Sequence, residues 1–391
     1  ENFPFKSLPF APVHQEKGYG EMDITLGCDS NYREGILAVI KSIAVASDSS
    51  SVRVWSFAEG NDAIEMEKIF EEHAYDKIYP RKNLRVVRYE RREELDHVLG
   101  TEQQQHPHSR RNLLGSEQGN YIRFFMPKIF AEMPTEQRPK QFLYLDCDTL
   151  VLEDPRNLAN EISRQLGKDT QICMGAAKSS SSKPTRWGTR EILKTMGIQI
   201  ELYHGLNAGV LFIDVDCWNQ SGALERILYW LKKNKNQHIF YRGKASSQTP
   251  LYYSFFPSMT ILSPKNESKM YPKPWPYLVF LPKWNRNTQN MTTVNDASIL
   301  HFAGKTKPWS IDATSIQKQI YSHYTTTTNT INNDNINPTS SLMSSLSSPS
   351  RSLSLRSLYQ KFVTKHKNEE EAEMERSRET KKNKRHTLTR R

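Results

Sequence analysis

The sequence lacks any run of about 18 apolar residues, so it predicts no membrane-spanning helix within its 391 residues. Cysteine is scarce as well. Cys28, Cys147, Cys173 and Cys217 are too few for a disulfide scaffold, and no CxxC pair or Cys/His cluster predicts a zinc site. The patterns GxGxxG, GxxxxGKS/T and GxSxG do not occur either. A Rossmann dehydrogenase, a P-loop nucleotidase and a serine hydrolase therefore lose their main sequence support.

Apolar residues make up only 37% of the chain, and its C-terminal segment accounts for much of this low share. Residues 325–357 are mainly Thr, Asn and Ser, which bury too little apolar surface to offset chain entropy. Residues 351–391 carry 13 basic and 6 acidic side chains, and thus most of the net charge of +11. We expect residues 325–391 to form a disordered or weakly helical, solvated tail with no nucleic-acid partner. A tail that binds nucleic acid or a membrane is the alternative.

Residues 21–324 alternate between short apolar segments and amphipathic segments, and we interpret them as one domain. This alternation predicts an α/β fold with a mostly parallel central sheet and helices on both faces. Residues 1–20 form an irregular lead-in, residues 100–119 a polar loop, and residues 257–284 show no clear period. The predicted strands are 22–27, 51–58, 84–89, 141–145, 206–214 and 298–302, and the predicted helices are 34–46, 61–73, 120–130 and 222–234.

Two carboxylates follow the apolar strand that ends at residue 145. One residue separates Asp146 from Asp148, so in an extended chain their side chains point to the same side. The carboxyl end of a buried strand is also where open α/β sheets bind ligands. Two close carboxylates repel each other unless a cation lies between them, and their hard oxygens select Mg²⁺ or Mn²⁺. A metal site is one interpretation, and a polar strand end that enters a turn is the other.

A second Asp-x-Asp pair, Asp214 and Asp216, competes with the first. It also follows an apolar strand, but a predicted helix begins directly after it. We therefore favour a structural role and expect Asp216 to cap the N-terminus of that helix.

Residues 301–309 bring together several groups that suit a phosphate and its metal ion. His301 is a candidate third metal ligand, Gly304 would let the backbone approach a ligand, and Lys307 is a point charge suited to a phosphate. By itself His301 is more typical of a core histidine. Beside the Asp146/Asp148 pair, the metal-ligand interpretation is favoured.

The end of the first strand offers a fourth candidate. Asp29 precedes a predicted helix and either caps it or accepts hydrogen bonds from a base or ribose, while Tyr32 is suited to stacking on a base. Spacing alone favours the helix cap.

In combination these residues resemble glycosyltransferase family 8, the retaining group that includes lipopolysaccharide galactosyltransferases, glycogenin and galacturonosyltransferase-like proteins. The resemblance covers about residues 20–310. Four blocks carry it in order: MDITLGCDSNY at 22–32, NYIRFF at 120–125 leading into FLYLDCDTLVLED at 142–154, LNAGVLFIDVDCW at 206–218, and HFAGKTKPW at 301–309.

The resemblance implies a GT-A fold and an Mn²⁺-dependent (or Mg²⁺-dependent) UDP-sugar site. It implies that the metal ligands are Asp146, Asp148 and His301. It places Asp29, Asn31 and Tyr32 near the uridine, Gly304 and Lys307 on the diphosphate, and Arg123, Asn207 and Ala208 around the donor sugar. Cys147, between the two acids, belongs to the same donor-binding set.

One segment departs from the family pattern. Family members usually carry Asp-Gln-Asp near the anomeric carbon, whereas here the matching residues are Ser247, Gln248 and Thr249. Gln248 is retained, and we take Gln248, Arg123 and Asn207 as candidate catalytic residues. The missing acids motivate an alternative, a weakly active or inactive member of the fold that binds sugar nucleotides or glycans.

We thus predict a retaining hexosyl- or uronosyltransferase that uses a UDP-sugar and a glycan or other hydroxyl acceptor. An interaction protein that acts through its basic tail is a further alternative. The chain starts at Glu1, and we expect a native N-terminus, with room for a membrane anchor, to have preceded it. Sequons at Asn219, Asn266 and Asn290, together with the family, favour the Golgi lumen or secretory pathway over the cytoplasm.

Overall fold

The structure is a computed structural model, and the described residues all belong to the first of two units, Glu1–Asp334 and Asn335–Arg391. The lead-in 1–20, the polar loop 100–119 and the tail 325–391 lie outside the described residues. The described residues are 22–28, 32–90, 93–94, 121–166, 172–178, 206–237, 247–255, 259–261, 269–270, 277–280, 286–287, 297–303, 307–310, 313 and 318.

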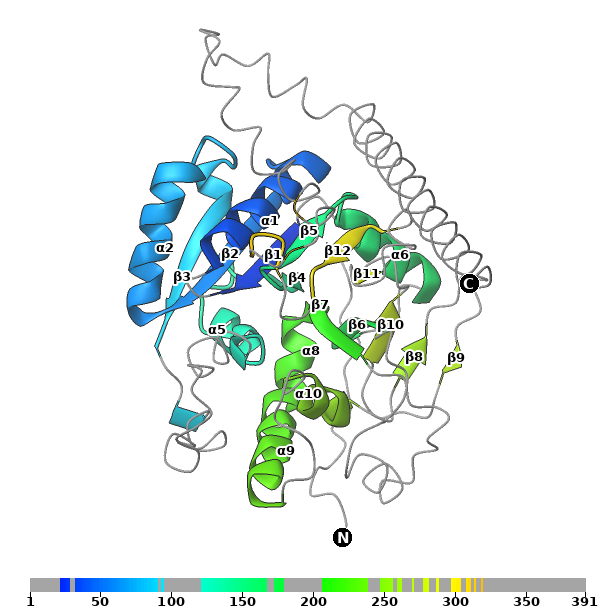
Figure 1. Ribbon diagram of the computed structural model, residues 1–391. Helices are drawn as coiled ribbons and strands as arrows, with labels where there is room; N and C mark the ends of the chain where they lie inside the picture. The colour runs from blue at the N-terminus through cyan, green and yellow to red at the C-terminus, as the bar shows by residue number, and fades with distance from the viewer. Residues whose placement is uncertain are drawn as a thin grey trace, which may run out of the picture. The chain divides into compact units, whose positions relative to one another are not determined.

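Four parallel strands form the first half of the main sheet in the order β3-β2-β1-β4. Two helices follow the first two strands, so the predicted alternation of strand and helix is confirmed (Figure 1). These elements are β1 (Met22–Gly27), α1 (Arg33–Ala46), β2 (Val52–Glu59), α2 (Gly60–His73), a 3-10 turn (Arg81–Asn83), β3 (Leu84–Tyr89) and β4 (Gln141–Leu145).

The second half of the sheet begins with β7 (Leu206–Asp214), which is antiparallel to β4 and to β6 (Met174–Lys178). β10 continues parallel to β6 and β8, and β9 closes the edge antiparallel to β8. The sequence predicted β7 but did not predict the other four strands of this half. They are short, and three of them lie in residues 257–284, which show no clear period. Those three are β8 (Met259–Ile261), β9 (Lys269–Met270) and β10 (Tyr277–Phe280).

A separate three-stranded sheet connects the end of the domain to the turn after β4. Its order is β11-β12-β5, with β12 antiparallel to β5. In that register His301 lies opposite Thr149, the residue that follows Asp148. The strands are β5 (Thr149–Val151), β11 (Arg286–Asn287) and β12 (Ile299–His301). This sheet is what carries the His301 segment to the Asp146–Asp148 turn.

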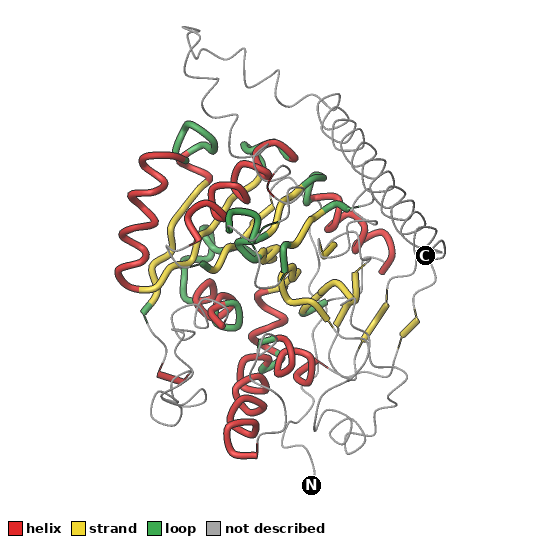
Figure 2. The backbone as a smooth tube through the Cα atoms, in the orientation of Figure 1, coloured by secondary structure: helices red, strands yellow, loops and turns green. Residues whose placement is uncertain are grey.

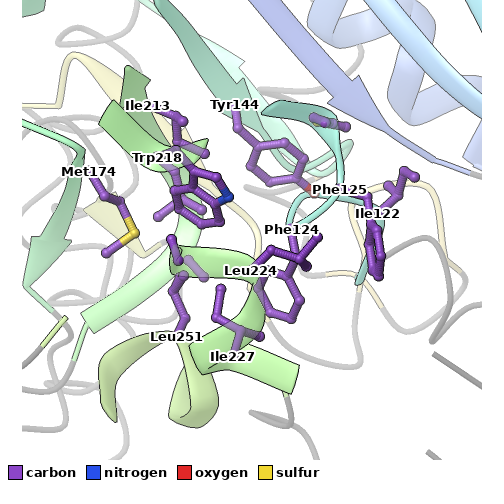
Figure 3. Close-up of a cluster of buried hydrophobic side chains, with 14 of the residues drawn as sticks. Ile122, Phe124, Phe125, Tyr144, Met174, Ile213, Trp218, Leu224, Ile227 and Leu251 are labelled. Carbon is purple, nitrogen blue, oxygen red and sulfur yellow. The ribbon is translucent and has the colours of Figure 1, made fainter. Parts of the chain in front are cut away.

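Helices cover both faces of the main sheet, as predicted. Phe142 and Tyr144 of β4 join one buried cluster, and the alternate residues Leu143 and Leu145 join another. The first cluster includes residues of α5 (Met126–Ala131), α8 (Val215–Gln220), α9 (Ala223–Gln237) and α10 (Gln248–Phe255), some of which Figure 3 shows around Tyr144 and Trp218. The second includes residues of α1, α2 and α6 (Arg156–Leu166), on the other side of the strands in Figure 2.

The predicted continuous helix 120–130 is wrong. Residues 123–125 form a turn, and α5 begins only at Met126. Pro127 explains the late start, because proline lacks an N–H and is favoured in the first turn of a helix rather than in its interior. Among the helices that the structure describes, none has both the length and the apolar character needed to cross a bilayer.

Candidate functional site

Three side chains from two distant segments meet at the carboxyl end of β4. The imidazole Nε2 of His301 lies 3.2 Å from Oδ1 of Asp148 and 3.5 Å from Oδ2 of Asp146. One potential ligand atom from each residue lies within 4.8 Å of the other two. The structure therefore brings together the three residues for which the sequence predicted a shared metal ion.

The backbone of the Asp146–Asp148 turn is fixed from two sides. The N–H of Asp146 donates to the carbonyl of Gly209 on β7 at 2.8 Å, and the N–H of Phe302 donates to the carbonyl of Asp148 at 2.8 Å. Within the turn, the hydroxyl of Thr149 donates to the carbonyl of Asp146 at 2.8 Å. The two carboxylates are therefore held on a rigid part of the backbone, which favours tight coordination.

The two oxygens of Asp146 have different partners. Oδ1 accepts hydrogen bonds from the guanidinium of Arg123 at 2.9 Å and from the hydroxyl of Tyr144 at 2.7 Å. Oδ2 faces His301. Arg123 also donates to the carbonyl of Ala208 at 2.5 Å, and its guanidinium lies 4.5 Å from the centre of the Tyr144 ring. Arg123 therefore orients Asp146; its predicted contact with the donor sugar stays a prediction.

Positive charge surrounds Asp148, which is almost completely buried. Burial alone would raise its pKa, but His301 and Lys307 outweigh burial and hold the pKa of Asp148 well below its usual range. The ammonium group of Lys307 contacts Oδ2 of Asp148 and donates to the carbonyl of Phe302 at 3.1 Å. Lys307 therefore lies beside the candidate metal ligands; its predicted contact with a diphosphate stays a prediction.

The donor set fits a divalent ion of the predicted kind. Two carboxylates and one imidazole offer oxygen and nitrogen ligands that suit Mn²⁺, and the buried anionic charge favours a cation. Asp146 and Asp148 with His301 would hold such an ion. That assignment, and the choice of Mn²⁺ over Mg²⁺, stays a prediction.

Gly209 creates the space that His301 occupies. A methyl group at position 209 would overlap the imidazole ring. Gly209→Ala is therefore expected to displace His301 and to weaken Mn²⁺ binding about 10- to 100-fold. Titration of Mn²⁺ by electron paramagnetic resonance checks this.

Gly60→Ala is the matched control for that substitution. Gly60 has φ +45° and no neighbouring atom within 4 Å of an added Cβ, so an alanine there costs roughly 1–2 kcal/mol of backbone strain and leaves the site intact. We expect Gly60→Ala to bind Mn²⁺ as the parent does. Unchanged Mn²⁺ affinity in Gly209→Ala would show that His301 is not a ligand.

The affinity for Mn²⁺ is expected to rise with pH. Burial lowers the pKa of His301, but Asp148 and Asp146 outweigh it and raise the pKa above its ordinary value of 6.5. An incoming ion needs the neutral imidazole and must displace its proton below the raised pKa. Calorimetric Mn²⁺ titrations from roughly pH 5.5 to 8.5 should show affinity that climbs through and beyond 6.5 and then levels off.

The stability of the metal-free protein should change in the opposite direction. Because folding raises the pKa of His301, protonated His301 adds to the free energy of unfolding. This contribution is fully present below pH 6.5 and is lost as the pH rises through the raised pKa. Mn²⁺ affinity that does not depend on pH would contradict a proton on His301 in the metal-free site.

The remaining predicted donor-binding residues are only partly described. Tyr32 lies edge-to-face with Trp309, with ring centres 6.0 Å apart. Burial lowers the pKa of Lys307, but Asp148 and, to a smaller extent, the nearby Tyr32 raise it above its ordinary value. This places Tyr32 beside the metal site. Asp29, Asn31 and Gly304 lie outside the described residues.

Of the residues predicted around the donor sugar, Asn207 and Ala208 lie on β7, which packs against α10, the helix of the catalytic candidate Gln248. Oδ1 of Asn207 accepts a hydrogen bond from the N–H of Gly209 at 3.0 Å, and the Ala208 carbonyl accepts from Arg123. Gln248 is the first residue of α10 and is half-buried. The catalytic roles of Gln248, Arg123 and Asn207 stay predictions.

The second Asp-x-Asp pair has the structural character that the sequence predicted, but the capping residue is different. Asp214, not Asp216, is the N-cap of α8, and its carboxylate accepts a hydrogen bond from the N–H of Cys217 at 2.8 Å. The helix begins at Val215, two residues earlier than a cap at Asp216 would require, so the capping position falls on Asp214. Asp216 instead forms an ion pair with Arg138 at 3.4 Å.

Sequence reasoning missed two disulfides. Cys28 pairs with Cys147, and Cys173 pairs with Cys217. Spacing gave no indication of them, because 119 and 44 residues separate the partners. The placement of Cys28 and Cys147 just beyond two apolar strands was the available clue, since adjacent parallel strands end at the same edge of a sheet.

Known proteins resemble this chain over most of its length. The sequence model described as glycosyl transferase family 8 matches residues 23–313. General stress protein A of Bacillus subtilis (strain 168) is 25% identical over 224 residues, which are 56% of this chain and 68% of that protein. The crystal structure of an active-site mutant of LgtC has a TM-score of 0.51 and 16% identity, covering 78% of this chain and 96% of that chain. Mouse xyloside xylosyltransferase 1 in its apo form has a TM-score of 0.45 and 13% identity, covering 73% and 99%.

Proposed function

The chain belongs to glycosyltransferase family 8, and from this premise we propose that it moves a hexosyl or uronosyl group from a UDP-sugar to a hydroxyl acceptor with retention of configuration. Its membership of this family and its GT-A fold identify the protein as a glycosyltransferase. The observation that carries the finer proposal is the meeting of Asp146, Asp148 and His301 beside Lys307. These groups suit a divalent ion and the diphosphate of a nucleotide sugar.

When bound, the metal ion supplies positive charge that stabilises the negative charge of the departing diphosphate. The residues of the chain prepare this position. Arg123 and Tyr144 hold one oxygen of Asp146, so that the other points toward His301. Lys307 is anchored on Asp148 at the rim of the same site, where its charge is suited to a phosphate oxygen. A diphosphate is already a good leaving group, so the site needs no acid for it.

Retention requires either a protein nucleophile or attack by the acceptor from the face that the diphosphate leaves. Gln248 is a poor nucleophile, and Ser247 and Thr249 replace the acids that the family usually carries beside it. We favour same-face attack, in which the acceptor hydroxyl bonds to the anomeric carbon and passes its proton to the departing phosphate. A covalent glycosyl-enzyme trapped on a residue near 248 would refute this route.

The experiment that tests the function is a donor panel. The full chain is incubated with Mn²⁺ and each of several UDP-sugars, and released UDP is measured with and without acceptor glycans. Turnover of one donor supports a transferase. UDP binding without turnover of any donor would instead favour the second candidate, a sugar-nucleotide or glycan binder, which the replaced acids at 247 and 249 motivate.

We also propose that the protein works in the secretory pathway. Its two disulfides support this, because disulfides persist in oxidising compartments and are rare in the cytosol. Asn219 of one sequon is an exposed residue of α8. A shift in gel mobility after glycosidase treatment of the protein from eukaryotic cells would support this address. Recovery of the protein in the cytosolic fraction with its cysteines as free thiols would refute this location.

A further inference from the structure

One of the two disulfides is attached to the turn that carries the candidate metal ligands Asp146 and Asp148. Cys147 is the residue between Asp146 and Asp148, and Cys28 directly follows β1. β1 and β4 are adjacent and parallel, with Leu26 opposite Leu145, so both cysteines lie two residues beyond paired positions at the same edge of the sheet (Figure 1). Their Cα atoms are 6.2 Å apart, within the usual range for a disulfide.

Each residue of the metal-binding turn is connected to a different part of the fold. The N–H of Asp146 bonds to β7, and the carbonyl of Asp148 bonds to the residue after β12. Cys147 is connected through its sulfur to the end of β1. The disulfide is thus the covalent link between the turn and the strand end that leads to Tyr32.

Close packing makes the orientation of Cys147 matter. A methyl group on Gly35, in the first turn of α1, would overlap the carbonyl oxygen of Cys147 and crowd the ring of Trp309. The turn, the start of α1 and the ring of Trp309 are therefore closely packed around Gly35. A change in the position of Cys147 would be passed to the carboxylates on both sides of it.

We propose that the Cys28–Cys147 disulfide is a positioning element of the metal site, and that its oxidation state controls the affinity of the site for a divalent cation. The inference rests on the proposed metal site. Reduction by a dithiol transfers two electrons and two protons to the disulfide, breaks the S–S bond, leaves two thiols and converts the dithiol to its own disulfide. The turn then keeps its hydrogen bonds to β7 and Phe302 but loses its link to β1.

The test compares Mn²⁺ binding by the full chain in its oxidised and reduced states. The protein is reduced with a dithiol, desalted under argon, and titrated with Mn²⁺ by electron paramagnetic resonance, which reports both affinity and the symmetry of the bound ion. Reduction should weaken binding about 10-fold and broaden the spectrum, because the ligands lose part of their outer support. Alkylation and mass spectrometry before and after reduction count the thiols at each cysteine.

The second disulfide provides the matched control. Cys28→Ser should bind Mn²⁺ as weakly as the reduced parent, and reduction should change its affinity no further. Cys173→Ser removes the disulfide between Cys173 and Cys217, far from the turn in sequence, and should keep both the parent affinity and the 10-fold response to reduction. Circular dichroism confirms that each variant is folded, and reduction of the parent gives the same comparison without any substitution.

Two results would overturn the inference while leaving the proposed function standing. One is equal Mn²⁺ affinity and an unchanged spectrum in the oxidised parent, the reduced parent and Cys28→Ser. The other is alkylation of Cys28 and Cys147 in protein that has never been reduced. If the oxidised parent bound neither Mn²⁺ nor UDP, the proposed function itself would fail and the inference with it.

Discussion

Asp148→Asn should lower kcat/KM for sugar transfer by on the order of 10³-fold, because loss of a metal ligand removes several kcal/mol of transition-state stabilisation. Asp148 contacts both His301 and Lys307 and is 7% exposed, so an amide there also leaves the ammonium group of Lys307 with a neutral partner. The measurement is UDP release at saturating Mn²⁺ with the donor identified by the panel. Mn²⁺ affinity should fall in parallel.

Asp216→Asn is the control for this substitution, since it makes the same chemical change in the second Asp-x-Asp pair. Asp216 is paired with Arg138 at 3.4 Å, and both side chains are partly exposed. Its loss should cost no more than about 1 kcal/mol of stability and should leave turnover unchanged. Equal activity of Asp148→Asn and the parent would end the metal-site proposal, and equal loss in both variants would indicate damage to the fold rather than to the site.

The two Asp-x-Asp pairs show how far sequence reasoning reaches. Both follow an apolar strand, and the difference between them lies in what comes next. Asp214 directly precedes a helix and Asp216 lies in its first turn, and a helix needs a cap for its free N–H groups. Asp146 and Asp148 enter a turn that is followed by a short strand. The local sequence therefore predicted which pair is structural, although it assigned the cap to Asp216 instead of Asp214.

The position of His301 was not available from local pattern alone. Its approach to Asp148 depends on the antiparallel pairing of β12 with β5, two strands of three residues each that are about 150 positions apart in the chain. The apolar segment 298–302 predicted a strand, but a strand this short does not indicate its partner. Residue type favoured His301 as a third ligand beside the Asp pair, and the resemblance to the family supported that interpretation. Short length also explains why β8–β11 were missed.

The partners of Arg123 lay beyond prediction for a different reason. Sequence pattern can mark a buried strand, but it cannot say which polar side chain fills the space above it. Arg123 has two apolar residues on each side in the sequence. It is buried in the turn that precedes α5, whose first turn contains Pro127. Its guanidinium then satisfies Asp146 and the Ala208 carbonyl at once. The resemblance predicted a nearby location, but not the ion pair.

Arg123→Met should produce the largest loss of stability in the site, about 3–5 kcal/mol, because removing one partner of a buried ion pair leaves the other charge uncompensated. The Arg123 side chain is 2% exposed, and methionine has a similar length without the charge. Urea unfolding in the absence of metal measures the loss. Arg138→Met breaks the exposed ion pair with Asp216 and should cost only about 0–1 kcal/mol.

A double-mutant cycle decides whether that loss comes from the ion pair or from the packing of the guanidinium on Tyr144. If the stranded charge on Asp146 is the cause, Asp146→Asn should cost little in the background of Arg123→Met, because the amide no longer needs a counter-ion. If packing is the cause, the two losses should add. Tyr144 continues to donate to position 146 in either case, so the coupling energy isolates the guanidinium. A loss below about 1 kcal/mol in Arg123→Met alone would show that Asp146 is held in place without Arg123.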